Sequence, residues 1–375
     1  MPLPIATVFT DLPDPRIDTA NTLHSLTDIL TIAVCAIIGG ADGWEQIAEY
    51  GRRKEAFFRR FLALPNGIPS HDTFYRVFTA LDPAAFAQRF GQWMAAACEG
   101  TGLIPIAIDG KSARRAKRAN ATGCLCVVSA WATTNRLTLG QVAVPDGTSE
   151  IGVIPDLLNT LDLAGAIVTI DAAGCQVANA QIIRDQEGHY LLAVKGNQPT
   201  LHDAVRAVFD RACETEFADT RCDRHESIED RHGRHDERYV TVIYDPVGLP
   251  ADWPDVAAVV LVGREREVKG VNASTAHYYL TSHAGTAAEL AGLIRSHWEI
   301  ENGLHWILDV AFREDENRTR DLNAGANLAL LRRVAVSLLK RVEAKGSIQT
   351  RRLMAAWDDD FLLQVLQGIP ANHSA

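Results

Sequence analysis

Apolar residues recur at three- and four-residue spacing through the first hundred positions. The spacing runs over residues 26–38, 44–61 and 84–97, with breaks at Gly39-Gly40 and at 64–69. This period is that of helices with one buried face, and glycine and proline mark the turns between them. We therefore predict an N-terminal helical domain over residues 1–98.

One helix of this domain is predicted to begin after the loop at 64–69. Ser70 precedes the segment HDTFYRVFTAL and has a side chain suited to an N-cap. His71, Thr73, Tyr75 and Arg76 would then lie partly outward. Two interpretations remain open, a helix that reads DNA and a helix of a packed bundle.

From about residue 101 the pattern changes to that of strands and helices in alternation. Apolar runs at 104–108, 124–132 and 137–144 predict a meander of three strands. A helix over 149–161, a strand over 166–170, a helix over 176–186 and a strand over 189–194 follow. The order βββαβαβ predicts an α/β, ribonuclease-H-like fold, a mixed sheet with helices on both faces. Its first part would span 99–212.

Residues 213–283 interrupt this order. Residues 214–238 are polar and carry both charge signs, and β-like runs follow at 239–244, 256–262 and 277–280. We predict a β-rich insertion there. A long helix over about 287–311 would complete the core within 284–325, and a basic amphipathic helix over 327–344 would open a C-terminal helical region, 326–375.

Composition indicates an ordinary globular protein of a reducing compartment. Hydrophobic residues make up 47% and charged residues 22%, and the seven cysteines include no CxxC pair. No basic start precedes an apolar core, and the longest apolar run falls short of the roughly 20 residues that span a bilayer. We expect a cytoplasmic protein without a membrane partner.

The net charge of −10 argues against a nucleic-acid partner, which usually requires a basic surface. The charge is unevenly distributed, however. Residues 331–352 hold seven cations against one acid, and residues 111–118 hold five cations and no acid. These two segments weaken the objection.

Two aspartates follow directly on predicted strands. Asp109 ends the run at 104–108, and Asp171 ends the run at 166–170. In open α/β sheets ligands bind beyond the carboxyl ends of strands, and a lone strand-end aspartate often caps the next turn instead. Their joint placement on the first and fourth strands favours a shared site for Mg²⁺ or Mn²⁺. Two such ions about 4 Å apart suit phosphodiester displacement.

A third carboxylate is expected on the helix after the insertion. Glu299 and Glu301 are the candidates, and at 100° per residue they point about 200° apart. Glu301 shares a stripe with Leu304 and Leu308, so we choose Glu301 as the residue that faces the sheet. His297, Glu301 and His305 would also fit a zinc stripe, although the order HExxH is absent.

Long strings of this chain resemble one transposase family. They are IAIDGKSARR, IVTIDAAGCQ with LLAVKGNQPTLH, HWEIENGLHWILDVAFREDENRTR and NLALLRRVAVSLLKR. These strings look like the insertion-sequence transposases of the ISAs type, also known as H-repeat-associated proteins, a branch of the DDE transposases. The stretch from LPDPR to LPNGIPSHDTFYRVFTALDP resembles their helical N-terminal domain. The similarity covers nearly the whole chain.

The resemblance implies a function and a site. Asp109, Asp171 and Glu301 match the DDE triad, which would bind Mg²⁺ (or Mn²⁺), as two ions, and cut and rejoin DNA. The implied partners are double-stranded DNA, as transposon ends and as target, and a second copy of the chain on DNA. The implied location is the bacterial cytoplasm, at the nucleoid.

The chain departs from the family pattern at several positions. The wider group usually has a Tyr, an Arg and a Lys at fixed offsets from the glutamate, where this chain has Ile294, His297 and Leu308. The family often has a His near Cys126. These departures put the associated phosphate contacts in doubt, with Arg295, Arg318 and Arg320 as nearby substitutes.

Further basic residues are candidates for contacts with the DNA backbone. Lys111, Arg114 and Arg115 follow Asp109, and Lys195 follows the strand at 189–194. Solvated surface charges are the alternative for each of them. Two other functions also stay open, a catalytically silent DNA-binding relic of a transposase and a general ribonuclease-H-like nuclease.

Overall fold

The chain folds into two compact units in a computed structural model. The first unit comprises Met1–Glu99, Gly110–Leu161 and Ile300–Ala375, and the second comprises Gly100–Asp109 and Asp162–Glu299. The described residues are 5, 8–10, 12–17, 22–98, 103–117, 123–231, 234–268 and 271–368. These units cut across the predicted domain boundaries, because the N-terminal and C-terminal helices pack together.

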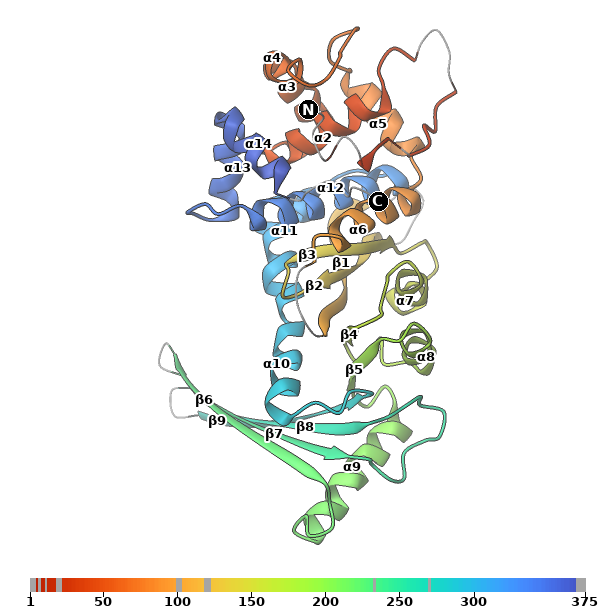
Figure 1. The fold of residues 1–375 in the computed structure, drawn as a ribbon, viewed down its shortest axis with the longest axis vertical. Helices are drawn as coiled ribbons and strands as arrows, with labels where there is room; N and C mark the ends of the chain where they lie inside the picture. The colour runs from red at the N-terminus through yellow and green to blue at the C-terminus, as the bar shows by residue number, and fades with distance from the viewer. Residues whose placement is uncertain are drawn as a thin grey trace. The chain divides into compact units, whose positions relative to one another are not determined.

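The first unit is mostly helical (Figure 1). Its helices are α2 (Leu26–Ile38), α3 (Trp44–Arg53), α4 (Glu55–Phe58), α5 (His71–Ala80), α6 (Pro83–Ala95), α7 (Glu150–Asn159), η1 (Glu301–His305), α11 (Trp306–Val310), η2 (Glu314–Glu316), α12 (Leu322–Arg341), α13 (Ile348–Trp357) and α14 (Asp359–Gln367). Its strands are β2 (Cys124–Ala132) and β3 (Leu137–Ala143), beside the second half of β1 (Ile104–Lys117).

The second unit carries most of the sheet. Its strands are β4 (Ala166–Ile170), β5 (His189–Val194), β6 (Cys222–Arg231), β7 (Arg234–Tyr244), β8 (Ala258–Val268) and β9 (Val271–Thr281), and its helices are α8 (Val177–Asp185), α9 (Pro199–Glu214) and α10 (Ala287–His297). The strand order is β1-β4-β5-β9-β8-β7-β6 in this unit and β3-β2-β1 in the first.

The predicted ribonuclease-H-like architecture is confirmed. The elements from β1 to β5 follow the order βββαβαβ, with β1, β4 and β5 parallel and β2 antiparallel to β3. Helices cover both faces within each unit. In the second, α10 and α8 lie on opposite sides of β4 and β5 (Figure 1). In the first, α7 packs on Gly140 of β3, whereas Arg333 of α12 reaches Ser129 from the other side of β2.

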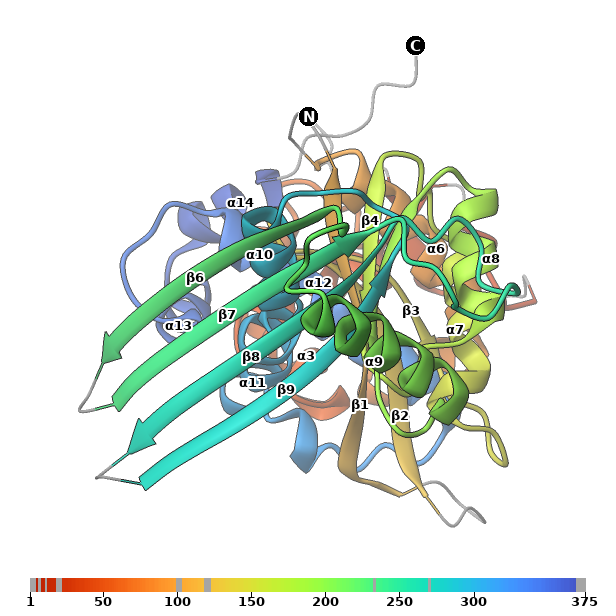
Figure 2. The ribbon, with the colours of Figure 1, turned by 90° about the horizontal axis from the view of Figure 1, so that it is seen from below.

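Residues 213–283 form an extension of the same sheet, because β9 pairs antiparallel with β5 and β8, β7 and β6 follow outward. The long strands of this extension are aligned in Figure 2. The predicted runs covered only parts of β7, β8 and β9, and β6 was missed. Strand β6 escaped prediction because both of its faces carry mainly charged and polar residues, although α10 partly covers one of them, and this leaves no apolar period.

The predicted long helix is present but contains a π-turn. Helix α10 is followed by η1, in which the Trp306 N–H donates to the Glu301 carbonyl, and then by α11. Such a turn inserts about one extra residue into a helix and shifts the phase of everything beyond it. Side-chain directions on the two sides of η1 therefore do not follow one 100° count.

The basic C-terminal segment is not a basic surface, contrary to the prediction. Arg332 and Arg333 of α12 are 1% and 0% exposed, and Arg352 of α13 is 5% exposed. Their guanidinium groups bind buried partners, such as the Asp42 carbonyl for Arg332 and the Ile37 carbonyl for Arg352. The charges of this segment therefore hold helices together.

Helix α5 begins as predicted, with the Ser70 side chain accepting from the Thr73 N–H. His71, Tyr75 and Arg76 are exposed. The opposite side packs on α12, where Asn327 donates to the Phe78 and Leu81 carbonyls. Among the described helices, none is both long and apolar enough for a bilayer crossing.

Substitution of Glu314 tests the importance of the buried ion pair with Arg333. The Arg333 guanidinium lies 2.9 Å from the Glu314 carboxylate, and the two side chains are 0% and 3% exposed. We expect Glu314→Ala to lower the free energy of unfolding in urea by about 3–5 kcal/mol, since it leaves an uncompensated buried charge. Glu316→Ala removes an exposed partner of Arg313 two residues away and should leave the unfolding midpoint unchanged. Equal effects of the two changes would contradict the assignment.

Candidate active site

Asp109 and Asp171 stand beside each other on neighbouring parallel strands. The pairing of β1 with β4 runs in register from Ile104 opposite Ala166 to Ile108 opposite Ile170. Each of the two aspartates directly follows one residue of the last pair, Asp109 within β1 and Asp171 just after β4. Since paired strands lie roughly 4.8 Å apart and paired residues share a face, both carboxylates project from one face at one level.

The strand that carries Asp109 does not end there, contrary to the prediction. Strand β1 continues to Lys117, so Lys111, Arg114 and Arg115 lie on a strand rather than in a loop. The partner strand β4 ends at Ile170. Asp109 therefore lies where the pairing with β4 stops, which leaves the edge beside it open for the Asp171 turn.

The turn after Asp171 is held by a local hydrogen-bond network. One carboxylate oxygen, Oδ1, accepts from the Ala173 and Gly174 N–H groups at 3.1 and 3.2 Å. Asn197 donates to the Ala172 carbonyl at 2.7 Å, and Gln198 donates to the Cys175 carbonyl at 3.0 Å. Asp171 thus caps its own turn through one oxygen, and the loop after β5 braces that turn.

His297 at the end of α10 lies on the aspartates' side of the sheet. Its Nδ1 is 2.9 Å from the hydroxyl of Thr169, which precedes Asp171 by two residues and so shares its face. Burial lowers the pKa of His297, while Asp171 and a hydrogen bond to the backbone of Thr169 act in the opposite direction. The ring is therefore neutral near pH 7. His297 occupies the offset at which the wider group usually has an arginine.

Glu301 belongs to the first unit and begins the π-turn. Glu299 and Glu301 are both exposed, whereas Leu304 and Leu308 of the predicted stripe are buried. Because the π-turn lies between Glu301 and Leu308, the helix-phase argument for Glu301 does not hold. The choice of Glu301 now depends on the sequence motif alone.

The six basic candidates have different environments. Lys111 is nearly buried, with Nζ 2.7 Å from Asp309, and Arg114 is paired with Asp315 at 3.2 Å although it is 84% exposed. The other four are exposed: Arg115, Lys195, Arg318 and Arg320. Arg118, which belongs to the same basic run as Lys111, lies outside the described residues.

Glu150 is a carboxylate of the first unit to which sequence reasoning gave no role. It begins α7, and its carboxyl group lies so close to Gly110 that an added Cβ there would meet it at 2.5 Å. The Cys126 thiol donates to Glu150 Oε1 at 2.9 Å, and burial, together with that bond, raises the pKa of Cys126 to about 12. Cys126 is therefore a neutral thiol.

The donor chemistry of the paired aspartates suits a hard cation. Two carboxylates at one level of one sheet face offer the oxygen ligands that Mg²⁺ and Mn²⁺ prefer. Over the described ranges, no three His, Cys, Asp or Glu residues form a group that could hold a metal ion. A further ligand would therefore have to join the aspartate pair.

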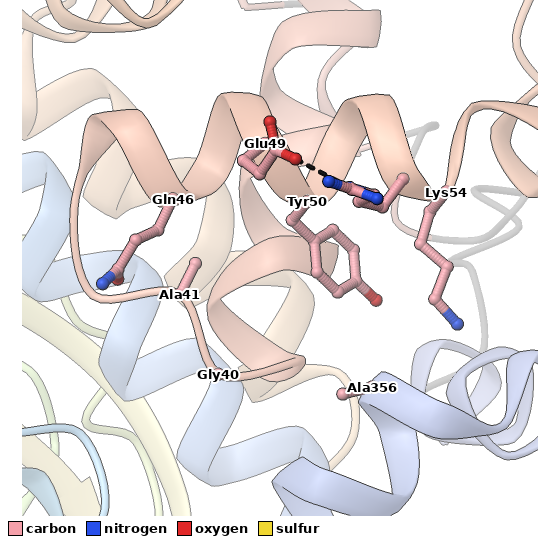
Figure 3. Close-up of a pocket in the computed structure, with 8 residues that line it drawn as sticks. Gly40, Ala41, Gln46, Glu49, Tyr50, Lys54 and Ala356 are labelled. Atoms are coloured by element: carbon pink, nitrogen blue, oxygen red, sulfur yellow. Dashed lines mark hydrogen bonds and ion pairs between the residues drawn. The ribbon is translucent and has the colours of Figure 1, made fainter.

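The first unit has a surface pocket whose lining differs from the surroundings of the two aspartates, which belong to the second unit (Figure 3). It is lined by residues that include Gly40, Ala41, Tyr50, Lys54 and Ala356. Its acid, Glu49, is 2.7 Å from Arg53, and burial raises the pKa of Tyr50. This pocket presents no pair of carboxylates comparable with that of Asp109 and Asp171.

The sheet order, with the two aspartates where the pairing of β1 with β4 stops, is that of a ribonuclease-H-like protein. Comparison with known proteins narrows this class. The profile of the family described as "Transposase DDE domain" matches residues 100–338, and the one described as "DDE_Tnp_1-associated" matches residues 6–94. The chain belongs to the DDE transposase family.

Individual relatives agree with this assignment. The "H repeat-associated putative transposase YhhI" of Escherichia coli (strain K12) is 35% identical over 95% of this chain and 96% of its own length. The "Putative transposase YncI" of Escherichia coli O157:H7 is 35% identical over 95% and 92%. The "Uncharacterized protein in dhlA 3'region" of Xanthobacter autotrophicus is 44% identical over 72% and 92%. The predicted resemblance is thereby confirmed.

Replacement of Thr169 tests the contact that holds His297. Thr169→Val keeps the shape of the side chain and removes the hydroxyl, which leaves a polar atom of a largely buried ring without this partner. We expect the free energy of unfolding to fall by about 1–3 kcal/mol in urea titrations at pH 7.5. Thr169→Ser retains the hydroxyl and should lose less than half as much. If the two variants lose the same stability, the hydrogen bond does not hold the ring.

Proposed function

We propose that this protein is a transposase that cuts and rejoins DNA with divalent metal, with Asp109, Asp171 and Glu301 as its metal-binding carboxylates. The observation that carries the proposal is the in-register pairing of β1 with β4, which sets two carboxylates side by side on one face. The motif around Glu301, which resembles that of the DDE family, supports it as the third carboxylate. The partners proposed are duplex DNA, as transposon ends and as target, and a second copy of the chain on that DNA, at the bacterial nucleoid.

Mg²⁺ or Mn²⁺, as two ions when bound, would stabilise the attacking and leaving oxygens of phosphodiester displacement. The residues of this chain contribute position and charge. The hydrogen bonds of the Ala173 and Gly174 N–H groups to one Asp171 oxygen fix the orientation of that carboxylate. The neutral ring of His297 adds no competing positive charge beside it. Water would attack in the cutting step and a DNA 3′-hydroxyl in the joining step, with no covalent protein–DNA intermediate.

Substitution of either aspartate tests the metal role. We expect Asp109→Asn and Asp171→Asn each to reduce Mg²⁺-dependent cleavage of a transposon-end duplex by about 10²- to 10³-fold or more, because each removes a charge placed for the transition state. Asp203→Asn is the matched control, since this aspartate is 80% exposed on α9. Cleavage at the wild-type rate by Asp109→Asn would overturn its assignment.

The choice between the two glutamates needs its own experiment. Glu301→Gln should abolish cleavage while the melting temperature stays within a degree of wild type, since the residue is exposed. Glu299→Gln, also at an exposed position two residues earlier, should retain activity. The comparison is made by cleavage assays on the same duplex. The reverse pattern of activities would move the third carboxylate to Glu299.

One observation favours the alternative of a catalytically silent DNA-binding relic. Ile294 and Leu308, at offsets where the wider group usually has polar side chains, are 9% and 0% exposed. Apolar side chains buried in this way cannot contact phosphate. DNA binding without strand breakage in the presence of Mg²⁺ or Mn²⁺ would favour the relic, and equal degradation of end-bearing and arbitrary DNA would favour a general nuclease.

A further inference from the structure

The register of the second unit places the aspartates on a particular face of the extended sheet. Asp171 follows Ile170, which pairs with Leu192, and so stands level with Ala193. The pairs that continue outward from Ala193 run through Tyr279, Val260 and Val242 to Asp223. Because residues paired across strands share a face, this row marks the face of Asp171 and Asp109 across the whole extension.

Contacts identify this face as the one covered by α10. The Asp223 carboxylate accepts from the Ala287 N–H at the start of α10 at 2.8 Å. Val242 and Val260 belong to one buried cluster with Leu290 of α10. Helix α9 lies on the opposite face of the strands (Figure 1). The term aspartate face is used below for the α10 side of β5 and β6–β9.

Cations follow on the aspartate face toward the hairpin ends. Arg238 of β7 pairs directly with Arg264 of β8, four residues along the strands from the row of Val242 and Val260, and therefore on the same face. Lys195 lies two residues beyond Ala193, opposite His277, where it helps burial to lower the pKa of that histidine. Arg295 of α10 forms an ion pair with Glu229 of β6. Arg238 also lies 3.8 Å from the same carboxylate. Four cations thus gather on this face against two acids, the ion-paired Glu229 and Asp223 beside the start of α10.

The opposite face carries the other sign of charge. Glu237 and Glu265 are a cross-strand pair on β7 and β8, and Glu226 of β6 lies one row away. Tyr239 donates to Glu237. Two like charges directly opposite each other are unfavourable in a sheet. The extension nevertheless has such a pair on each face, two glutamates on the back and two arginines on the aspartate face, so that the two signs of charge are separated. The extension is basic on the aspartate face and acidic on its back.

We propose that the aspartate face of the extension binds the phosphate backbone of the DNA that is cut, through Lys195, Arg238 and Arg264. This inference rests on the proposed function, and it names the surface that positions the substrate. From the strand spacing and the rise per residue, Arg264 lies on the order of 20 Å from the level of Asp171. At 3.4 Å per nucleotide along one strand, this is roughly six nucleotides. DNA phosphates complement this face and are repelled by the glutamates of the back.

The test measures how DNA binding depends on salt. The full chain carries Asp171→Asn so that the duplex stays intact, and Arg238→Ala/Arg264→Ala is added. Loss of two phosphate contacts should make the slope of log affinity against log salt shallower by about 2, with weaker binding on every duplex sequence. Arg238→Lys/Arg264→Lys keeps both charges and should restore the slope. Arg206→Ala on α9, 63% exposed on the other face, should leave it unchanged.

The outcomes separate this inference from the proposed function. An unchanged slope in Arg238→Ala/Arg264→Ala, in a protein that cleaves DNA when Asp171 is present, overturns the surface and leaves the transposase intact. A lower melting temperature with the slope preserved would mean that the arginines only tie β6, β7 and α10 together, which also overturns it. A chain that neither binds nor cleaves any duplex would instead contradict the proposed function.

Discussion

The parallel pairing of β1 with β4 is the constraint on which the candidate site depends. Its register sets Asp109 and Asp171 level with each other, although 62 positions separate them in the chain. Parallel neighbours need a long connection, and here β2, β3 and α7 supply it. A slip of one residue would turn one aspartate to the opposite face and separate the pair. The buried apolar residues of β4 hold that register, because they pack on both sides.

Other residues of the second unit lie on the same face of the sheet as the two aspartates. Thr169, two residues before Asp171, reaches His297, and the outer strands bring Arg238 and Arg264 to the same side. Since β9 pairs with β5, the extension inherits its two faces from the core sheet. A separate β domain would have no such fixed relation to the aspartates. The basic face of the extension therefore lies on the same side of the sheet as Asp109 and Asp171.

The arginines of α12 and α13 show that basic residues of a sequence segment need not form a basic surface. Arg332, Arg333 and Arg352 count toward a basic segment in the sequence but lie in the core of the first unit. Burial of a guanidinium is costly unless its donors are satisfied, and the Ile37 carbonyl for Arg352 and the Glu314 carboxylate for Arg333 offset only part of that cost. Other nitrogens of these groups, such as Nε and Nη1 of Arg332, have no hydrogen-bond partner among the described residues. Three of the seven cations of this segment are therefore absent from the surface of a chain whose net charge is −10. Any surface that attracts DNA must be built elsewhere.

The sequence by itself determined the order of elements from β1 to β5 and the positions of Asp109 and Asp171, because buried strands are visible as local, mainly apolar runs. Local patterns did not reveal β6, whose two faces are both mainly polar, or the π-turn after Ile300, which breaks the helical count used to choose Glu301. The pairing of β9 with β5 and the burial of Arg333 were decided by tertiary structure alone. Both arise between residues far apart in the chain, where no local period records which groups will meet.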